Sequence, residues 1–394
     1  MSTSTPPGNV AIAAAHEVRP GRYPELDRLR IQEYVLAHFL DACPLSPDVV
    51  DGLMVAPAGM ADSVGADVFV HERLTDALGL APRFAETINA GGATYATMVA
   101  RATAAIRAGS ADAVLCVGAG KFPVVGGGGG DTMAKIVSHP DFEYPYGSFI
   151  PAMYALAATR HMYERGTTRQ ALAQVAVTSR DWALRHPDAL MRGDGPLTAA
   201  DVFDSRPIAS PFNLYDCSVP CEGGAVVLVA REEIARELSD QPAYIRGYGE
   251  YHDHGAIAHA SDFTTMGAGK ATRAAFQMAG LTPSDVDVAQ LYDAFSSCPI
   301  WLLEEAGLAE RGKGGTHYLD GQAGLGGALP VNTYGGLLSF GHTGDASGMS
   351  MLVEGALQVM GRAGDRQVEA DVALVQTYGG MMADHCALLL GRQP

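Results

Sequence analysis

The sequence predicts an α/β protein built from two similar halves, and three observations lead to this prediction. Strand and helix patterns alternate along the chain, which is typical of mostly parallel sheets covered by helices. Two stretches of the first half recur in the same order in the second half. With 394 residues, 47% of them hydrophobic, the chain is long enough for two cores or one large fused core.

The first repeated stretch is a capped turn that leads into a short apolar run. Residues 45–51, LSPDVVD, match residues 281–287, LTPSDVD. Ser46 and Thr282 are suited to cap a helical turn, with a proline as the first helical residue. We expect buried strands in the apolar runs that follow.

The second repeated stretch is longer and combines a helix with a strand. The segment from Ala90 to Gly120 is similar to the segment from Gly344 to Gly380. Each has a small-residue turn, an amphipathic helix, a glycine stop and a buried strand that ends in glycine. Since both pairs occur in the same order at similar separations, internal duplication is indicated.

The region from about residue 121 to residue 207 has no counterpart in the second half, so we interpret it as an insertion. It contains five consecutive glycines, Gly126 to Gly130. No Gly-Lys-Ser/Thr follows them, which favours a flexible loop over a phosphate-binding loop.

Composition limits the classes of partner and the compartment. A net charge of −17 argues against nucleic acid or an anionic membrane as the main partner. The six cysteines include no CxxC pair and indicate a reducing compartment. The N-terminus does not resemble a secretory signal, and no apolar run approaches the length of a membrane span. We therefore expect a cytoplasmic protein.

The two repeated turns, Ala90–Thr94 and Gly344–Gly348, each lead into a helix and are expected to meet near a pseudo-twofold axis. Helix N-termini present free N–H groups and a partial positive charge. These two turns can therefore stabilise a developing oxyanion in a protein that is acidic overall, which makes Ala90, Gly91 and Gly344 candidate substrate-binding residues.

Four motifs, in this order, carry a resemblance to a known family. They are INAGGATYATMVARATAAIRAGSADAVLCVGAGKF, LYDCSVPCEGGAVVLVA, LYDAFSSCP and VNTYGGLLSFGHTGDASGMS. Together they resemble the thiolase superfamily over nearly the whole chain, and most of all its sterol-carrier-protein thiolase branch. The resemblance implies the thiolase fold, in which two duplicated βαβαβαββ halves form a five-layer αβαβα sandwich. We expect the halves at 1–235 and 236–394, with the insertion at about 121–207.

The sequence departs from the thiolase pattern at the positions of the thiolase catalytic residues. Ala90 falls where thiolases have the nucleophilic cysteine, and a methyl group cannot form an acyl-enzyme. The second thiolase cysteine falls near Thr377 and Tyr378. Tyr292 stands where thiolases have an Asn or His that binds the thioester oxygen. The catalytic histidine is kept as His342, in Gly-His-Thr instead of Gly-His-Pro.

This pattern resembles thiolase-like aldolases of bacterial steroid side-chain degradation, which cleave a β-hydroxyacyl-CoA by a retro-aldol reaction. The resemblance implies a homodimer, a small partner with an OB-fold and a zinc ribbon, and no cofactor besides the CoA of the substrate. A retro-aldol reaction needs no nucleophile, but it needs a proton-transfer group and donors to the enolate oxygen. An ordinary tyrosine has a pKa near 10, so a tyrosine base needs a lowered pKa.

The resemblance therefore makes Tyr292, His342 and Tyr378 the candidate catalytic residues. Asp345 beside His342 is a further candidate for substrate contact. Tyr334, in the NTYGG motif, is a candidate substrate-binding residue with packing as the alternative. Asp293 either orients a neighbour or is an exposed loop carboxylate.

Alternative functions and sites stay open at this stage. The protein is alternatively an acyltransferase or thiolase with a relocated nucleophile, or a non-catalytic subunit that binds acyl-CoA or lipid. Packing in the core is nevertheless favoured for Cys217, Cys298 and Cys386. The segment YHDHG, residues 251–255, has two histidines but no evident third ligand, so a polar loop is favoured over a metal site.

Overall fold

The computed structural model describes residues 8–43, 45–59, 69–122 and 129–394. Its first half contains the elements β1 (Val10–Glu17), α1 (Arg28–Ala42), β2 (Gly52–Val55), α2 (Val70–Leu78), β3 (Phe84–Thr87), α3 (Thr94–Arg107), β4 (Ala113–Lys121), β7 (Glu222–Arg231) and α8 (Glu232–Leu238). Its second half contains β8 (Ala243–His252), α9 (Ala268–Ala279), β9 (Val288–Leu291), α10 (Cys298–Glu305), α11 (Gly314–Leu319), α12 (Gly336–Ser339), α13 (Ser347–Met360), β10 (Val372–Gly379) and β11 (Asp384–Gly391).

The sheet confirms the duplication, because the four strands that the two halves share have the same order and the same directions. The order is β3-β2-β4-β7-β1 in the first half and β9-β10-β11-β8 in the second. β2 pairs with β4 in parallel, as β9 pairs with β10, whereas β7 and β11 are antiparallel to their neighbours. A short antiparallel pairing of β1 with β8 joins the two halves into one nine-stranded sheet.

The second half departs from the expected βαβαβαββ order at its third strand. Where the first half has β3, the second has only a parallel bridge between Val331 and Ala289. Pro330 precedes the bridge and Asn332, with a φ of 52°, follows it. A proline cannot donate a ladder hydrogen bond and a left-handed residue breaks the extended backbone, so no longer strand forms here.

The repeated turns also support the duplication, because an equivalent aspartate in each turn makes the same hydrogen bonds. Short 3-10 turns, Pro47–Val49 and Pro283–Asp285, precede β2 and β9. The Asp51 carboxylate then accepts hydrogen bonds from the backbone of Asp112 and Ala113 at the start of β4. The Asp287 carboxylate does the same for the residues that start β10, at 371 and 372.

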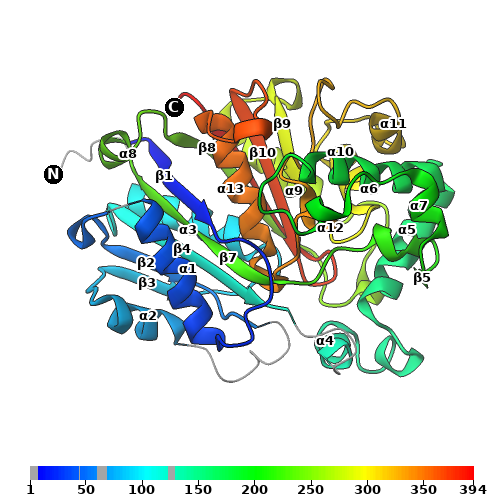
Figure 1. Ribbon diagram of the computed structural model, residues 1–394, viewed down its shortest axis with the longest axis horizontal. Coiled ribbons are helices and arrows are strands. Elements are labelled where there is room, and N and C mark those ends of the chain that lie inside the picture. The colour runs from blue at the N-terminus through cyan, green and yellow to red at the C-terminus, as the bar shows by residue number, and fades with distance from the viewer. Residues whose placement is uncertain (1–7, 44, 60–68, 123–128) are drawn as a thin grey trace.

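The two halves of the sheet, with helices between them and on their outer faces, form a five-layer αβαβα sandwich (Figure 1). In β4, Leu115 and Val117 face the core beneath α1, while Val114 and Cys116 face the opposite core, which contains α3. This alternation buries both faces of the sheet, as expected of parallel strands covered by helices. The helices α3 and α13 pack against each other and touch strands of both halves, and α9 packs on β8 and β11. The fold class predicted from the sequence is confirmed.

The insertion between β4 and β7 forms a mainly helical subdomain at the right of Figure 1. It contains α4 (Gly129–Val137), α5 (Ile150–Arg165), α6 (Arg169–Ala183), α7 (Ala199–Asp204), β5 (Pro207–Ala209) and β6 (Phe212–Asn213). Most of the glycine run lies outside the described residues, and Gly129 and Gly130 begin α4. The boundaries at 121–207 and at 235/236 stay a prediction.

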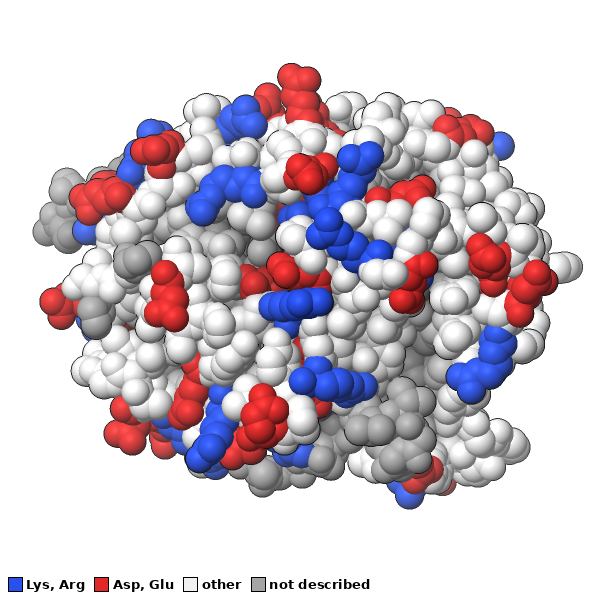
Figure 2. All heavy atoms as spheres, in the orientation of Figure 1, with Lys and Arg blue, Asp and Glu red and all other residues white. Residues whose placement is uncertain are grey.

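The surface agrees with the composition, and the helices give no sign of a membrane segment. Acidic and basic side chains are interspersed over the face in Figure 2, as expected for 44 acidic and 27 basic residues. Within the described ranges, every helix is too short or too polar to cross a bilayer.

Candidate active site

Tyr292 enters the site directly from the end of a buried strand. β9 is buried throughout, and the backbone N–H of Tyr292 donates to the Gln376 oxygen on β10 at 3.0 Å. The side chain is only 6% exposed. Its ring lies over Gly92, where a Cβ atom would come within 2.5 Å of the tyrosine ring. Glycine at 92 is therefore required for this ring position.

His342 is held by backbone hydrogen bonds to the segment that precedes β7. Its N–H donates to the Val219 oxygen at 2.7 Å, and its carbonyl accepts from the Cys221 N–H at 2.9 Å. The imidazole is buried and packs edge-on against the Phe122 ring, with 5.2 Å between ring centroids. The loop that carries His342 is thus fixed by the first half of the chain.

Tyr292 and His342 belong to one buried chain of hydrogen bonds. The N–H of Gly344 donates to His342 Nδ1 at 3.1 Å, so Nδ1 is unprotonated and Nε2 carries the proton of the neutral ring. Nε2 lies 3.2 Å from the Tyr292 hydroxyl, which lies 3.2 Å from the Ser347 Oγ at the start of α13. The imidazole N–H and the phenol O–H are therefore two neighbouring donors in a water-poor site.

Burial keeps the His342 imidazole neutral. It lowers the pKa of His342 from its ordinary value to about 4. In the unfolded chain this pKa returns to about 6.5, so the unfolded state binds more protons between these two values. The stability contributed by neutral His342 is complete above pH 6.5 and is lost as the pH falls through 4.

We therefore expect the free energy of unfolding to fall by about 3 kcal/mol through His342 alone as the pH drops from 7.5 to 4. Urea unfolding at a series of pH values measures this. A His342→Gln variant should show a shallower pH dependence, by about one proton, and an unchanged dependence would contradict the prediction. Other buried groups still contribute pH dependence in the variant: His186 and His385, whose pKa values burial also lowers, in the same direction, and Asp293, whose pKa burial raises, in the opposite one.

Tyr378, at the end of β10, lies against Tyr292 with 4.6 Å between ring centroids. Its hydroxyl is buried and has no hydrogen-bond partner among the described residues. Burial raises the pKa of Tyr378 well above its usual value near 10, with Cys298 and Tyr154 as its ionisable neighbours. This is opposite to the lowered pKa that a tyrosine base needs. In the resting protein, Tyr378 is an un-ionised phenol because no cation among the described residues offsets the loss of water.

The Ala90 turn packs directly onto the strand end that carries Tyr378. A Cβ atom at Gly379 would collide with the Ala90 carbonyl, and one at Gly91, whose φ is 57°, would touch the backbone of residues 379 and 380. A Cβ atom at Gly348 would in turn collide with the Gly92 carbonyl. The two repeated turns therefore meet beside Tyr292 and Tyr378, and the Ala90 side chain offers only a methyl group.

The structure says less about the roles of the other residues that were predicted to bind substrate. Gly344 contributes its N–H to His342, as described above. Tyr334 is buried and packs on Phe340, with 5.5 Å between ring centroids, and its hydroxyl has no partner in the described structure. The backbone of Asp345 belongs to the 3-10 turn Gly344–Ala346, but its side chain lies outside what the structure describes. Their predicted roles in substrate binding stay predictions.

Asp293 is fully buried, so the exposed-loop alternative is wrong. Its Oδ1 accepts the N–H of Leu337 at 2.8 Å, and burial raises the pKa of its carboxyl group to about 7. Through this hydrogen bond Asp293 orients the segment that contains Leu337, which agrees with the other alternative.

Sequence reasoning missed two side chains of the site. The Ser347 hydroxyl shares a hydrogen bond with the Tyr292 hydroxyl, but its position had only been interpreted as part of a small-residue turn. Tyr154 comes from α5 in the insertion, and its ring lies 4.5 Å from Phe295 and 6.3 Å from Tyr378. No repeat or motif points to Tyr154, because the insertion has no counterpart in the second half.

The cysteines lack the properties of a nucleophile. Burial raises the pKa of all six thiols, to about 12 for Cys217, Cys221 and Cys298. A cysteine attacks as the thiolate, which burial disfavours here. Cys298 and Cys386 are fully buried, as predicted for packing residues, and Cys217 is half-buried.

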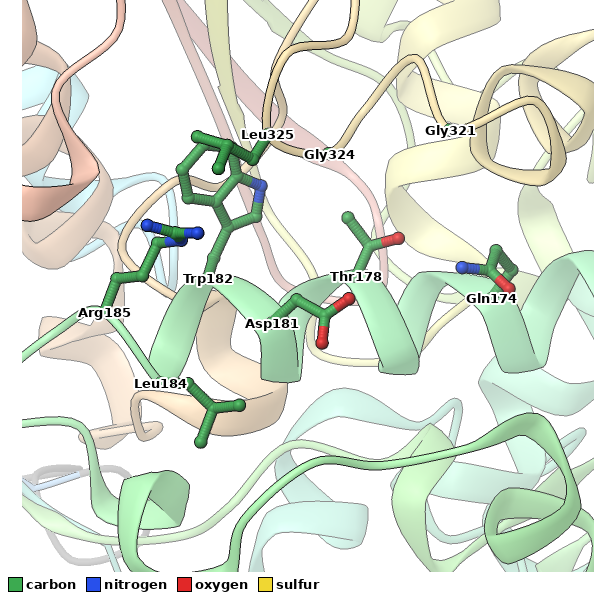
Figure 3. Close-up of a pocket in the computed structure, with 9 residues that line it drawn as sticks. All are labelled: Gln174, Thr178, Asp181, Trp182, Leu184, Arg185, Gly321, Gly324 and Leu325. Atoms are coloured by element: carbon green, nitrogen blue, oxygen red, sulfur yellow. The ribbon is translucent and has the colours of Figure 1, made fainter.

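Neither a group of metal ligands among the described residues nor the cavity in Figure 3 involves Tyr292 or His342. The described residues contain no group of three or more His, Cys, Asp or Glu side chains placed to hold a metal ion. In the YHDHG segment, His252 pairs with Asp384 at 2.6 Å, while His254 contacts the Met381 carbonyl. Figure 3 shows a cavity of about 440 Å³ between α6 and the loop after α11, lined by Trp182 and Arg185 among others.

Comparison with known proteins gives one family match and several relatives. Residues 249–392 match the family described as Thiolase C-terminal domain-like. An acetyl-CoA acetyltransferase of Methanothermobacter thermautotrophicus is 35% identical over 280 residues, which cover 68% of this chain and 72% of the relative. A steroid side-chain-cleaving aldolase of Thermomonospora curvata is 30% identical over 98% of each chain. A solved structure described as an Ltp2-ChsH2(DUF35) aldolase has a TM-score of 0.84 at 28% identity, covering 98% of this chain and 99% of that one.

Proposed function

This chain belongs to the thiolase superfamily, and we propose that within it the protein is a carbon–carbon lyase that cleaves a β-hydroxyacyl-CoA thioester by a retro-aldol reaction. The aldolases among its relatives, one of which is named for cleaving steroid side chains, support a steroid side-chain intermediate as the substrate.

One observation carries this proposal. The Tyr292–His342–Ser347 hydrogen-bond chain and the Tyr378 phenol meet at the turn where a thiolase has its nucleophile, and that turn offers only the Ala90 methyl group. The arrangement contains proton donors and lacks an ionised thiol. Such a site is suited to a reaction that forms an enolate without an acyl-enzyme.

The reaction assigns a role to each of these side chains. The bond between the α and β carbons breaks, and its electron pair moves into the thioester as an enolate. The Nε2–H of His342 and the O–H of Tyr292 donate to the enolate oxygen, as an oxyanion hole does. Tyr378 gives its phenolic proton to the α carbon and receives the proton of the β-hydroxyl group. The phenol is thereby regenerated, and the products are a carbonyl compound and a shortened acyl-CoA.

The state of Tyr378 is compatible with this role. A phenol that relays a proton in one concerted step does not have to be ionised in the resting enzyme. Its high pKa, which burial raises, then prevents loss of the proton to solvent before substrate binds.

The assembly, the substrate path and the location are part of the same proposal. We infer a cytoplasmic homodimer that works with a small OB-fold and zinc-ribbon protein and needs no cofactor besides the CoA of its substrate. The two components named for the aldolase structure support a partner protein. Substrate would enter beside the insertion, where α5 supplies Tyr154 to the site and also lines an apolar surface cavity of about 610 Å³.

The direct test is turnover of a panel of β-hydroxyacyl-CoA thioesters, with and without an OB-fold and zinc-ribbon partner, followed by mass spectrometry. We expect a carbonyl product and an acyl-CoA in equal amounts. If the thioesters bind tightly but are not turned over in the presence of the partner, the lyase proposal is wrong and the protein is a non-catalytic acyl-CoA-binding subunit.

The relocated-nucleophile alternative makes the opposite prediction for the cysteines. We expect Cys298→Ser and Cys386→Ser each to keep turnover within about a few-fold, because neither thiol takes part in the chemistry. Steady-state kinetics and labelling with a thiol reagent measure this. Stoichiometric acylation of one cysteine by an acyl-CoA, with loss of activity when that residue is replaced, would favour an acyltransferase.

A further inference from the structure

Asn332 has an unusual backbone conformation one hydrogen bond away from the strand that carries Tyr292. It is buried, and its φ of 52° is in the left-handed region, which asparagine tolerates better than most other side chains. It follows Val331, whose parallel bridge to Ala289 is all that the second half has of a third strand. Its own N–H donates to the Ala289 carbonyl at 3.0 Å.

After the bridge, the side-chain amide of Asn332 makes the hydrogen bonds to β9 that a third strand would otherwise make. Its Oδ1 accepts the N–H of Leu291 at 2.7 Å, and its Nδ2 donates to the Leu291 carbonyl at 2.8 Å. Both backbone groups of Leu291 on this side of β9 are thereby satisfied, as a neighbouring strand would satisfy them. An amide can do this because it has a donor and an acceptor side by side.

The chain around Tyr292 is held at three consecutive residues. Leu291 is bound to Asn332, Tyr292 donates its N–H to Gln376, and Asp293 accepts the N–H of Leu337. Two of these three contacts lead to the segment 332–337, which continues through α12 directly to His342. The position of Tyr292 is therefore fixed relative to the loop that carries its hydrogen-bond partner.

We propose that Asn332 is a positioning residue that sets the 3.2 Å contact between the Tyr292 hydroxyl and His342 Nε2. Its effect on turnover rests on the proposed lyase function, whereas its effect on the imidazole does not. Misplacement of a reacting group by about 1 Å can reduce a rate on the order of a hundred-fold, so a modest shift of β9 is sufficient.

The two hydrogen bonds between the Asn332 side chain and the Leu291 backbone form a clamp, and its chemistry allows a test by protonation. An ionised Asp at position 332 accepts from the Leu291 N–H but repels the Leu291 carbonyl and the buried Asp293 carboxylate beside it, whose pKa is raised to about 7 by burial. A protonated Asp has a donor and an acceptor again and can restore both hydrogen bonds. We expect Asn332→Asp to lower kcat about ten- to hundred-fold at pH 8, with KM within about three-fold, and to recover relative to the wild type as the pH falls.

Gln367 provides a matched control in the same half. Its Oε1 accepts the N–H of Ala363 and its Nε2 donates to the Gln358 carbonyl, both at 2.9 Å, so it is also a side-chain amide that bridges two backbone groups. It lies beyond the C-terminal end of α13, whose 14 residues span about 20 Å, while Ser347 lies at the other end. Gln367→Glu should leave kcat within about two-fold at every pH.

A second readout does not depend on turnover. In the wild type, ¹⁵N NMR should show a protected Nε2–H on the His342 imidazole, assigned with the His342→Gln variant. This signal should be lost in Asn332→Asp at pH 8, return at lower pH, and stay unchanged in Gln367→Glu. If Asn332→Asp does not fold, Asn332→Gly, which suits the left-handed backbone but lacks the amide, should lose the signal at every pH.

The outcomes separate the two proposals. A wild-type protein without lyase activity, whose imidazole signal still depends on residue 332 in this way, would refute the proposed function and support the clamp. An active wild type whose Asn332 variants have unchanged kcat and an unchanged imidazole signal would refute the clamp. An equal loss of activity in Gln367→Glu would also refute it, since general destabilisation would then explain the effect.

Discussion

Replacing Tyr292 with phenylalanine is expected to lower kcat about a hundred- to thousand-fold while the protein stays folded. The change removes one of two donors to the enolate oxygen, and loss of one such donor typically costs about 3–4 kcal/mol of transition-state stabilisation. The ring itself remains, so its packing over Gly92 and against Tyr378 is preserved. Steady-state kinetics on the thioester identified in the substrate panel measures the loss.

The matched control is Tyr244→Phe. Tyr244 is also a buried tyrosine of the second half, and its hydroxyl donates to Glu232 at 3.1 Å, near the start of β8 and away from the site. We expect this variant to keep kcat within about two-fold. Near-full activity in Tyr292→Phe would show that the Tyr292–His342 pair does not stabilise the enolate and would refute the proposed mechanism.

Replacing Tyr378 with phenylalanine is expected to cause a similar loss of kcat with a different effect on stability. The variant loses the group that moves the proton, so turnover should fall by at least about a hundred-fold. The Tyr378 hydroxyl is buried without a partner among the described residues, and such a group typically costs about 1–3 kcal/mol. Removing it should leave the free energy of unfolding unchanged or raise it.

Kinetics and urea unfolding on the same preparation test both parts of this prediction. Cys386→Ser is a suitable control, because Cys386 is a buried neighbour of Tyr378 on β11 and pairs with Thr377 in the ladder. It should lose stability and keep its activity, the reverse of Tyr378→Phe. If Tyr378→Phe loses both activity and stability, the hydroxyl has a structural role and the proton is moved elsewhere.

The sequence alone predicted the fold class correctly, because the features that determine it are local or repeated. The LSPDVVD and LTPSDVD turns, the small-residue turns before α3 and α13, and the buried strands after them are visible as patterns and recur in order. The two repeated small-residue turns were also expected to meet, and in the structure they do so beside Tyr292 and Tyr378. Each turn leads into one of the helices α3 and α13, which pack against each other.

Only the tertiary structure determined the electrostatics and the details of the contacts. The raised pKa of Tyr378 and the lowered pKa of His342 depend on how completely other segments remove water from these side chains, which no local pattern encodes. Tyr154 reaches the site from an insertion without a repeat. Asn332 acts through two hydrogen bonds to Leu291, 41 positions away in the chain, and Ser347 acts through one to Tyr292, 55 positions away. Such contacts depend on how distant segments pack, because a hydrogen bond forms only within a few tenths of an ångström of its preferred length.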